Sequence, residues 1–189
     1  AAAALGDWRA AQDLTARVVE PRFRAVAEAD LAAAYGRAGL ADQGLVALAA
    51  AESTVQAMAQ GYARSFAEAG AARAAGVLGA FDRAATLAEL VRDHRLRTQA
   101  MAALAVLAAG DAAAAERFAR AAFTAAGQVI DPVERAATRA ELMVQGYTFE
   151  PWRAIVEDAQ AENDPWPRLR ALAALAAVAA RVIPPAATE

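Results

Sequence analysis

The 189-residue sequence contains no cysteine, no lysine and only one histidine, His94. Without cysteine the chain forms neither disulfide bonds nor thiolate metal sites, and with one histidine a zinc site would need an unusual shell of carboxylates. Enzyme motifs are equally scarce: the sequence has no glycine-rich phosphate loop, no His-Glu-x-x-His motif and no nucleophile elbow. The sequence therefore predicts a protein that is not an enzyme and carries no metal or other cofactor.

Aromatic residues make up only 6% of the chain, and runs of alternating β-branched residues, which are typical of strands, are missing. Alanine instead supplies about one residue in three. Alanine has the highest intrinsic helix propensity and loses no rotamer entropy on burial. The composition therefore predicts an all-α fold with a core of small side chains.

The chain also lacks a basic excess, since its formal net charge is −3 and all 19 basic residues are arginine. Nucleic-acid binding depends on a net basic footprint, so no nucleic-acid partner is expected. Arginine without lysine is typical of a GC-rich genome, with anion recognition through guanidinium groups as the alternative. The longest apolar stretch, 171–180, is too short to span a bilayer, and no secretory signal is visible. We expect no membrane association and a cytoplasmic location.

What the sequence does contain is a junction that recurs five times: an acidic residue, a helix start and usually an arginine four residues on. We expect the acid to cap the helix, proline to occupy its first position, and the arginine to pair with the acid. The acidic residues are separated by 32, 41, 38 and 33 positions, which is typical of a two-helix repeat. The copies are Glu20-Pro21-x-x-Arg24, Glu52-Ser53-x-x-Gln56, Asp93-His94-x-x-Arg97, Asp131-Pro132-x-x-Arg135 and Asp164-Pro165-x-x-Arg168.

Four glycines, at 39, 70, 110 and 146, are expected to end the first helix of each pair in the left-handed conformation. The caps and glycines together predict first helices at about 21–38, 53–69, 94–109, 132–145 and 165–182. Second helices are predicted at about 7–19, 40–51, 71–92, 111–130 and 149–162. The segment 71–92 holds Gly76 and Gly79, so we expect a kink or a break near 79–82.

The early repeats carry a recognisable pattern of large, small and aromatic residues. Leu31-Ala32-x-x-Tyr35-x-x-x-Gly39-x-x-x-x-Gly44, followed by Leu48 and Ala51, resembles the tetratricopeptide repeat, and Tyr62-Ala63-x-x-Phe66-x-x-x-Gly70-x-x-x-x-Ala75 repeats it. Later pairs depart from the pattern, because no aromatic residue stands at the equivalent place before Gly110 or Gly146. The resemblance implies a right-handed α-solenoid of about ten helices in stacked antiparallel hairpins. We expect one helical-repeat domain, 1–189, that is a fragment of a longer solenoid or multidomain protein.

The junction Asp-Pro-x-x-Arg-Ala, followed by an Ala/Leu-rich helix, is similar to degenerate repeats in large bacterial proteins. This resemblance implies a non-enzymatic scaffold that binds a protein or peptide segment in its concave groove, or senses a ligand there. Two alternatives remain open. One is an all-α enzyme domain of the helical-barrel lyase or hydrolase type. The other is a structural spacer or self-assembly module, so homo-oligomerisation is also left open.

Candidate binding residues come from the tetratricopeptide analogy and from the aromatic residues. First helices line the groove in that family, which points to Asp30, Tyr62, Arg64, Gln99, Arg139 and Gln145. Aromatic residues gather late in the chain, and Trp152 and Trp166 are expected either to bracket a ligand or to cover the end of the solenoid. The basic cluster Arg92, His94, Arg95 and Arg97 is expected to pair locally, with anion binding as the alternative.

Overall fold

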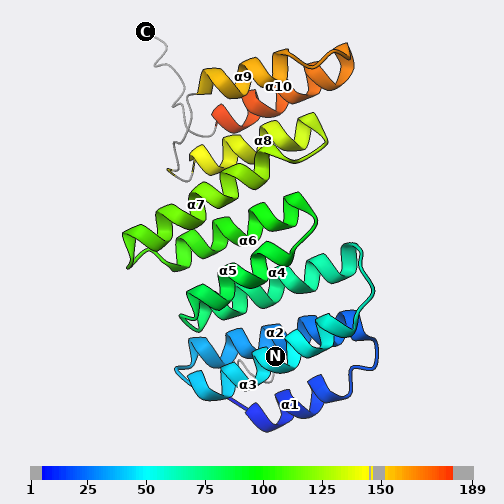
Figure 1. Ribbon diagram of the computed structural model, residues 1–189, viewed down its shortest axis with the longest axis vertical. Coiled ribbons are helices and arrows are strands. Elements are labelled where there is room, and N and C mark those ends of the chain that lie inside the picture. Colours follow the sequence, from blue (N-terminus) through cyan, green and yellow to red (C-terminus); the bar gives the residue numbers. More distant parts are fainter. Residues whose placement is uncertain (1–5, 145, 147–151, 181–189) are drawn as a thin grey trace. The chain divides into compact units, whose positions relative to one another are not determined.

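The computed structural model describes residues 6–144, 146 and 152–180, and this part of the chain forms ten α-helices and no strand (Figure 1). The all-α prediction is therefore confirmed. The helices are α1 (Trp8–Ala16), α2 (Pro21–Arg37), α3 (Ala41–Ala57), α4 (Tyr62–Val77), α5 (Phe81–Leu90), α6 (His94–Leu107), α7 (Ala112–Gly127), α8 (Pro132–Val144), α9 (Trp152–Gln160) and α10 (Pro165–Ala179).

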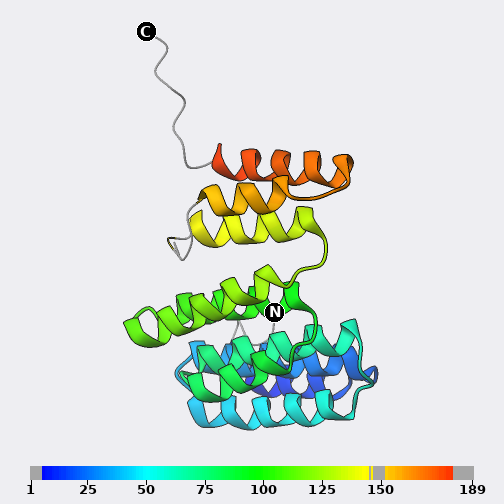
Figure 2. The ribbon, with the colours of Figure 1, turned by 45° about the horizontal axis from the view of Figure 1, so that its top comes forward.

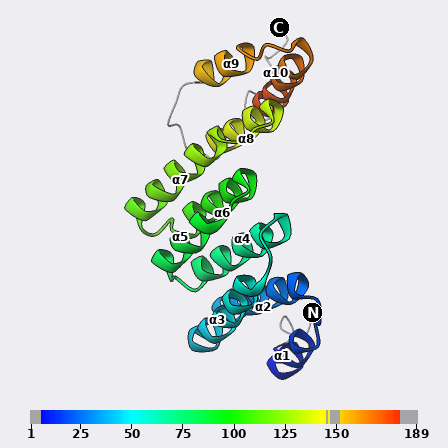
Figure 3. The same ribbon diagram turned by 45° about the vertical axis from the view of Figure 1, so that its right-hand side comes forward.

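The chain divides into two compact units, Ala1–Phe118 and Ala119–Glu189, with the boundary inside α7. In the first unit α2 packs against α3 and α4, and α4 packs against α5 and α6. The even-numbered helices α2, α4 and α6 therefore follow one another as neighbours, with α3 joining α2 to α4 and α5 joining α4 to α6 through short turns (Figures 2 and 3). In the second unit α8, α9 and α10 pack against one another. The sequence predicts one domain over 1–189, and this division into two compact units does not test that prediction.

The core of the first unit is made largely of alanine, and two glycines let its helices approach closely. A Cβ atom at Gly36 of α2 would lie 3.0 Å from Val77 Cγ1, and one at Gly76 of α4 would collide with the side chain of Leu104 in α6. Both contacts join the C-terminal halves of neighbouring even-numbered helices. The helices α2, α4 and α6 therefore run parallel, and small residues set their spacing.

Three of the expected acidic caps are confirmed. Asp93 accepts the backbone N–H of Leu96 at 2.9 Å, and Asp164 accepts that of Trp166 at 3.0 Å. Asp131 accepts two backbone N–H groups, at 2.8 and 2.9 Å, and so satisfies two donors of the first turn of α8. Glu20 precedes α2 without a side-chain cap bond. Pro21 occupies the first position of that helix, as the sequence predicts.

The second expected junction, at Glu52-Ser53, is wrong, because both residues lie inside α3. The Glu52 carboxylate accepts two N–H bonds from Arg83 of α5, at 2.6 and 2.9 Å. This hydrogen bond raises the pKa of the Arg83 guanidinium, with a smaller contribution from the charge of Glu52. The true junction follows Met58, where Gly61 adopts a φ of 151° that favours glycine and α4 begins.

Two of the four expected glycine caps are also wrong. Gly39 and Gly146 have positive φ, as predicted, but Gly70 lies in the interior of α4 and Gly110 lies outside the left-handed region. Gly79, with a φ of 74°, ends α4 instead. The predicted break near 79–82 is confirmed, since α5 begins at Phe81. The predicted ranges 40–51, 53–69 and 71–92 are replaced by α3, α4 and α5.

Three arginines of the expected junctions, Arg24, Arg97 and Arg135, have a different partner from the expected acid, and Arg64 at the junction before α4 has the same kind of partner. Each of these four arginines donates to the backbone carbonyl six residues earlier, at or just past the end of the preceding helix. The four bonds are Arg24 Nε to Val18 O at 2.7 Å, Arg64 Nη1 to Met58 O at 3.1 Å, Arg97 Nε to Val91 O at 2.7 Å, and Arg135 Nη1 to Val129 O at 3.0 Å. A charged donor on a carbonyl is worth about 1.5–3 kcal/mol. The repeated arginine therefore fastens the end of one helix to the start of the next.

Candidate functional site

Three of the expected binding residues lie exposed on the even-numbered helices of the first unit. They are Asp30 of α2, Tyr62 of α4 and Gln99 of α6. Tyr62 is 62% exposed and stacks on Phe66 one turn later, with ring centroids 6.4 Å apart. Phe66 is itself 41% exposed, so the first turns of α4 present two aromatic rings to solvent.

Equivalent positions on α2, α4 and α6 follow from their junction arginines, Arg24, Arg64 and Arg97. Residues two, six and nine positions after each arginine share one side of a helix. Because the three helices are parallel neighbours, these positions form one continuous surface. We call it the first-helix face; its larger exposed or half-buried side chains are Val26, Asp30, Phe66, Arg73, Gln99 and Val106. We include the exposed Phe23, one residue before Arg24, and Tyr62, two residues before Arg64, because they lie on the same side of their helices.

Small residues occupy the middle of the first-helix face. Gly70 lies between Phe66 and Arg73 on α4, and the nearest atom that a Cβ there would meet is Ala29 Cβ, 3.9 Å away. Ala33 of α2 and Ala103 of α6 stand at neighbouring repeat positions. The face therefore combines aromatic side chains near the helix starts with short side chains further along.

Two other candidates are engaged inside the fold. Arg64 bonds to Glu68 Oε1 at 2.8 Å, and its side chain is 19% exposed. Arg139 of α8 donates to Asp158 of α9 at 3.0 Å, and its guanidinium lies 5.4 Å from the ring centroid of Phe123. These arginines join neighbouring elements, so the structure assigns them a packing role and does not place them on an open surface.

The late aromatic residues separate in the second unit. Trp152 is half-buried and packs against the cluster formed by α8, α9 and α10, which includes Ile155 and Leu175. Trp166 begins α10 and is 66% exposed. Gln145 lies outside the described residues. Of the two tryptophans, Trp166 alone presents most of its surface to solvent.

One arginine of the basic cluster at the start of α6, Arg97, is engaged locally, with backbone carbonyls in place of the nearby acids. Asp93 caps the helix, and Arg97 donates to the carbonyls of Val91 and Glu89 at 2.7 and 3.1 Å. Within the described part of the chain, no group of three or more potential metal ligands comes together, and no helix is long and apolar enough to cross a membrane. The structure thus offers surfaces for binding and no assembled metal centre among the residues it describes.

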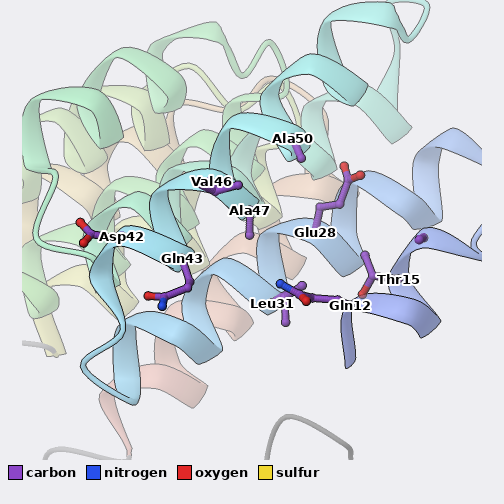
Figure 4. A pocket seen from close by; sticks show the side chains of 10 residues that line it. Gln12, Thr15, Glu28, Leu31, Asp42, Gln43, Val46, Ala47 and Ala50 are labelled. Carbon is purple, nitrogen blue, oxygen red and sulfur yellow. The ribbon is translucent and has the colours of Figure 1, made fainter. Parts of the chain in front are cut away.

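A groove of about 430 Å³ between α1, α2 and α3 was missed from the sequence (Figure 4). Its polar lining is Gln12 and Thr15 of α1, Glu28 of α2, and Asp42 and Gln43 of α3. The apolar surface of the groove comes from Leu31, Val46 and three alanines, Ala16, Ala47 and Ala50. The sequence does not show that α1 and α3 flank Glu28.

Comparison with known proteins adds no relative to this description: no family model, no curated protein and no solved structure matches the chain.

Proposed function

We propose that the first unit is a non-enzymatic interaction module that binds a peptide or protein segment on its first-helix face. The fold we propose for it is a right-handed α-solenoid of tetratricopeptide-like hairpins. Parallel packing of α2, α4 and α6 supports this proposal. So does Gly44 of α3, where a Cβ would lie 3.2 Å from the carbonyl oxygen of Ala32 in α2, because the tetratricopeptide pattern puts a small residue at that crossing.

The observation that carries the proposal is the exposed Tyr62–Phe66 stack. A buried aromatic pair would need no partner, but these two rings keep 62% and 41% of their surface in solvent. Aromatic side chains dominate the binding energy of protein interfaces when a partner buries them. Phe23 on α2 is 57% exposed and extends the aromatic surface onto the neighbouring helix.

Polar residues around the aromatic rings favour an orientation-specific contact. Asp30, Arg73 and Gln99 are exposed on the same face and offer an anion, a cation and an amide. A peptide laid across the three helices would bury its apolar side chains on Phe66 and form hydrogen bonds at this polar rim. The second copy of the tetratricopeptide pattern, Tyr62 to Ala75, is out of register with the first, since Gly79 and not Gly70 corresponds to Gly39. This shift leaves Tyr62 and Phe66 exposed.

The test is selection of a random twelve-residue peptide library on the whole chain, followed by titration of the selected peptides. Phe66→Ala and Tyr62→Ala should each weaken binding by about tenfold or more, because each removes an aromatic anchor. Trp166→Ala, which removes an exposed aromatic residue elsewhere, is the matched control and should leave the Kd within about twofold.

Two results would contradict the proposal. One is binding that survives both α4 substitutions unchanged. The other is a mass that rises with protein concentration in sedimentation velocity and falls back to that of a monomer in Phe66→Ala, which would make the first-helix face a self-assembly surface.

A further inference from the structure

The groove between α1, α2 and α3 lies on the opposite side of α2 from the first-helix face. Glu28 lines the groove and Asp30 belongs to the first-helix face. Two residues apart on an α-helix, these carboxylates are separated by about 160° around the axis. The groove is therefore a second surface, and an inference about it does not rest on the proposed function.

The chemistry of the lining selects the charge of an occupant. Two of the ten lining residues, Glu28 and Asp42, are acidic and none is basic. Val46 is 72% exposed at the groove, and Leu31 and Ala47 provide further apolar surface. An arginine or lysine side chain matches this combination, because its methylene groups pack on apolar surface while its charged end reaches a carboxylate.

The two carboxylates stand at opposite ends of the groove (Figure 4). Asp42 lies in the first turn of α3, and Glu28 lies beside Ala50 of the same helix, eight residues further along. Eight residues of α-helix rise about 12 Å. Residues four apart in an extended peptide are separated by about 13 Å and point to the same side. The spacing of the carboxylates therefore fits two basic residues four positions apart.

Polar groups between the two ends remain available to a peptide backbone. Gln12 of α1 and Gln43 of α3 lie between Glu28 and Asp42 in Figure 4, and their side chains have no protein hydrogen bond within the described residues. Glu28 is held in place, since Thr54 Oγ1 donates to its Oε2 at 2.7 Å. One carboxylate is thus oriented in advance, and two amides can accept from or donate to a bound main chain.

We propose that this groove binds an extended basic segment of a partner protein, with two arginine or lysine residues four positions apart, one at each carboxylate. Pockets of about 300–1,000 Å³ are typical of specific binding sites, and the volume of about 430 Å³ accommodates a few residues of extended chain.

The probe is a fluorescein-labelled ten-residue peptide with two arginines four positions apart in a glycine, serine and alanine background. Its affinity for the whole chain is measured by fluorescence anisotropy at two salt concentrations. Glu28→Gln and Asp42→Asn should each raise the Kd about three- to tenfold, as expected for partly solvated ion pairs. Glu28→Gln keeps an acceptor for Thr54. Gln43→Glu adds a carboxylate to the lining and should lower the Kd about threefold.

Asp30→Asn is the matched control, because it removes the same charge from the opposite side of α2. It should change the Kd by less than about twofold. Equal weakening in Asp30→Asn and Glu28→Gln would overturn the proposal in favour of unspecific charge attraction. So would equal affinity for a peptide with its two arginines adjacent, or no binding at low salt. Phe66→Ala should leave this peptide unaffected, so failure here is distinct from failure of the first-helix face.

Discussion

The two units contain the same local ion pair in different surroundings. In α4 of the first unit, Arg64 and Glu68 are four residues apart with an N–O distance of 2.8 Å. In α9 of the second unit, Arg153 and Glu157 have the same spacing and a distance of 2.7 Å. The side chains of the first pair are 19% and 2% exposed, and those of the second are 85% and 56% exposed. Sequence and geometry are matched, and only the burial differs.

This difference comes from the neighbours of each helix. Helix α4 packs against α2, α3, α5 and α6, whereas α9 packs against α8 and α10. The same effect separates α4 from α10: α4 buries nine of its 16 residues, including Ser65 and Glu68, and α10 buries three of 15 although it is richer in leucine. Burial in this protein therefore depends on the number of packed neighbours more than on the hydrophobicity of the helix itself.

The largest contrast is expected from removing the arginine of each pair. Arg64→Met leaves the Glu68 carboxylate buried and uncompensated and should lower the free energy of unfolding by about 3 kcal/mol. Arg153→Met should change it by less than about 0.5 kcal/mol, since solvent screens an exposed pair. Urea denaturation followed by circular dichroism measures both. Replacing both partners, as Arg64→Met with Glu68→Leu, should recover most of the loss, and equal effects of the two single substitutions would disprove the contrast.

An intermediate contrast is expected from enlarging alanine in α4 and in α10. Ala72 has no exposed surface, so Ala72→Leu must displace its neighbours and should cost about 1–3 kcal/mol of stability. Ala176 is exposed, and Ala176→Leu should stay within about 0.5 kcal/mol. The same denaturation measurement decides. Tolerance of leucine at position 72 would mean that α4 is less tightly packed than its burial indicates.

The smallest contrast concerns two glycines whose replacement by alanine should change the stability of the protein in opposite directions. Gly70 lies in the interior of α4, and a Cβ there would make only an ordinary contact, 3.9 Å from Ala29 Cβ, so Gly70→Ala should stabilise the protein by about 0.5–1 kcal/mol. Gly79 has a φ of 74°, so Gly79→Ala should destabilise it by about 1 kcal/mol. Thermal unfolding of the two variants gives the sign directly. Destabilisation by Gly70→Ala would support the helix end that the sequence predicts at position 70.

The sequence predicts the helices best where a local signal has one interpretation. Asp93, Asp131 and Asp164 precede helices because an aspartate at a cap has few competing roles there. The junction predicted at Glu52-Ser53 is wrong because glutamate is also common in helix interiors. The partner of Glu52, Arg83, lies 31 positions away, so no local pattern reveals their pairing. The helix end predicted at Gly70 is wrong for a similar reason. The sequence does not distinguish a glycine inside a helix from a glycine that ends one.

Binding residues are harder to predict than helices, because exposure depends on packing. Asp30, Tyr62 and Gln99 lie exposed on the first-helix face. Arg64 and Arg139 are equally suited to binding by their chemistry, but they form ion pairs with Glu68 and Asp158. The groove lined by Glu28 and Asp42 could not be predicted, since three separate helices form it. No pattern along the chain reports which helices become neighbours.

The bond from an arginine to the carbonyl six residues earlier, present at four junctions, determines where the chain tolerates insertions and deletions. The described helices vary in length from 9 to 17 residues, yet the separation between carbonyl and guanidinium stays at six residues for Val18, Met58, Val91 and Val129. The number of residues in the turn is therefore fixed by this bond, whereas the number of residues in the helices on either side is not. Insertions and deletions are therefore compatible with the fold within helices by whole turns, and incompatible with it inside these six-residue joints.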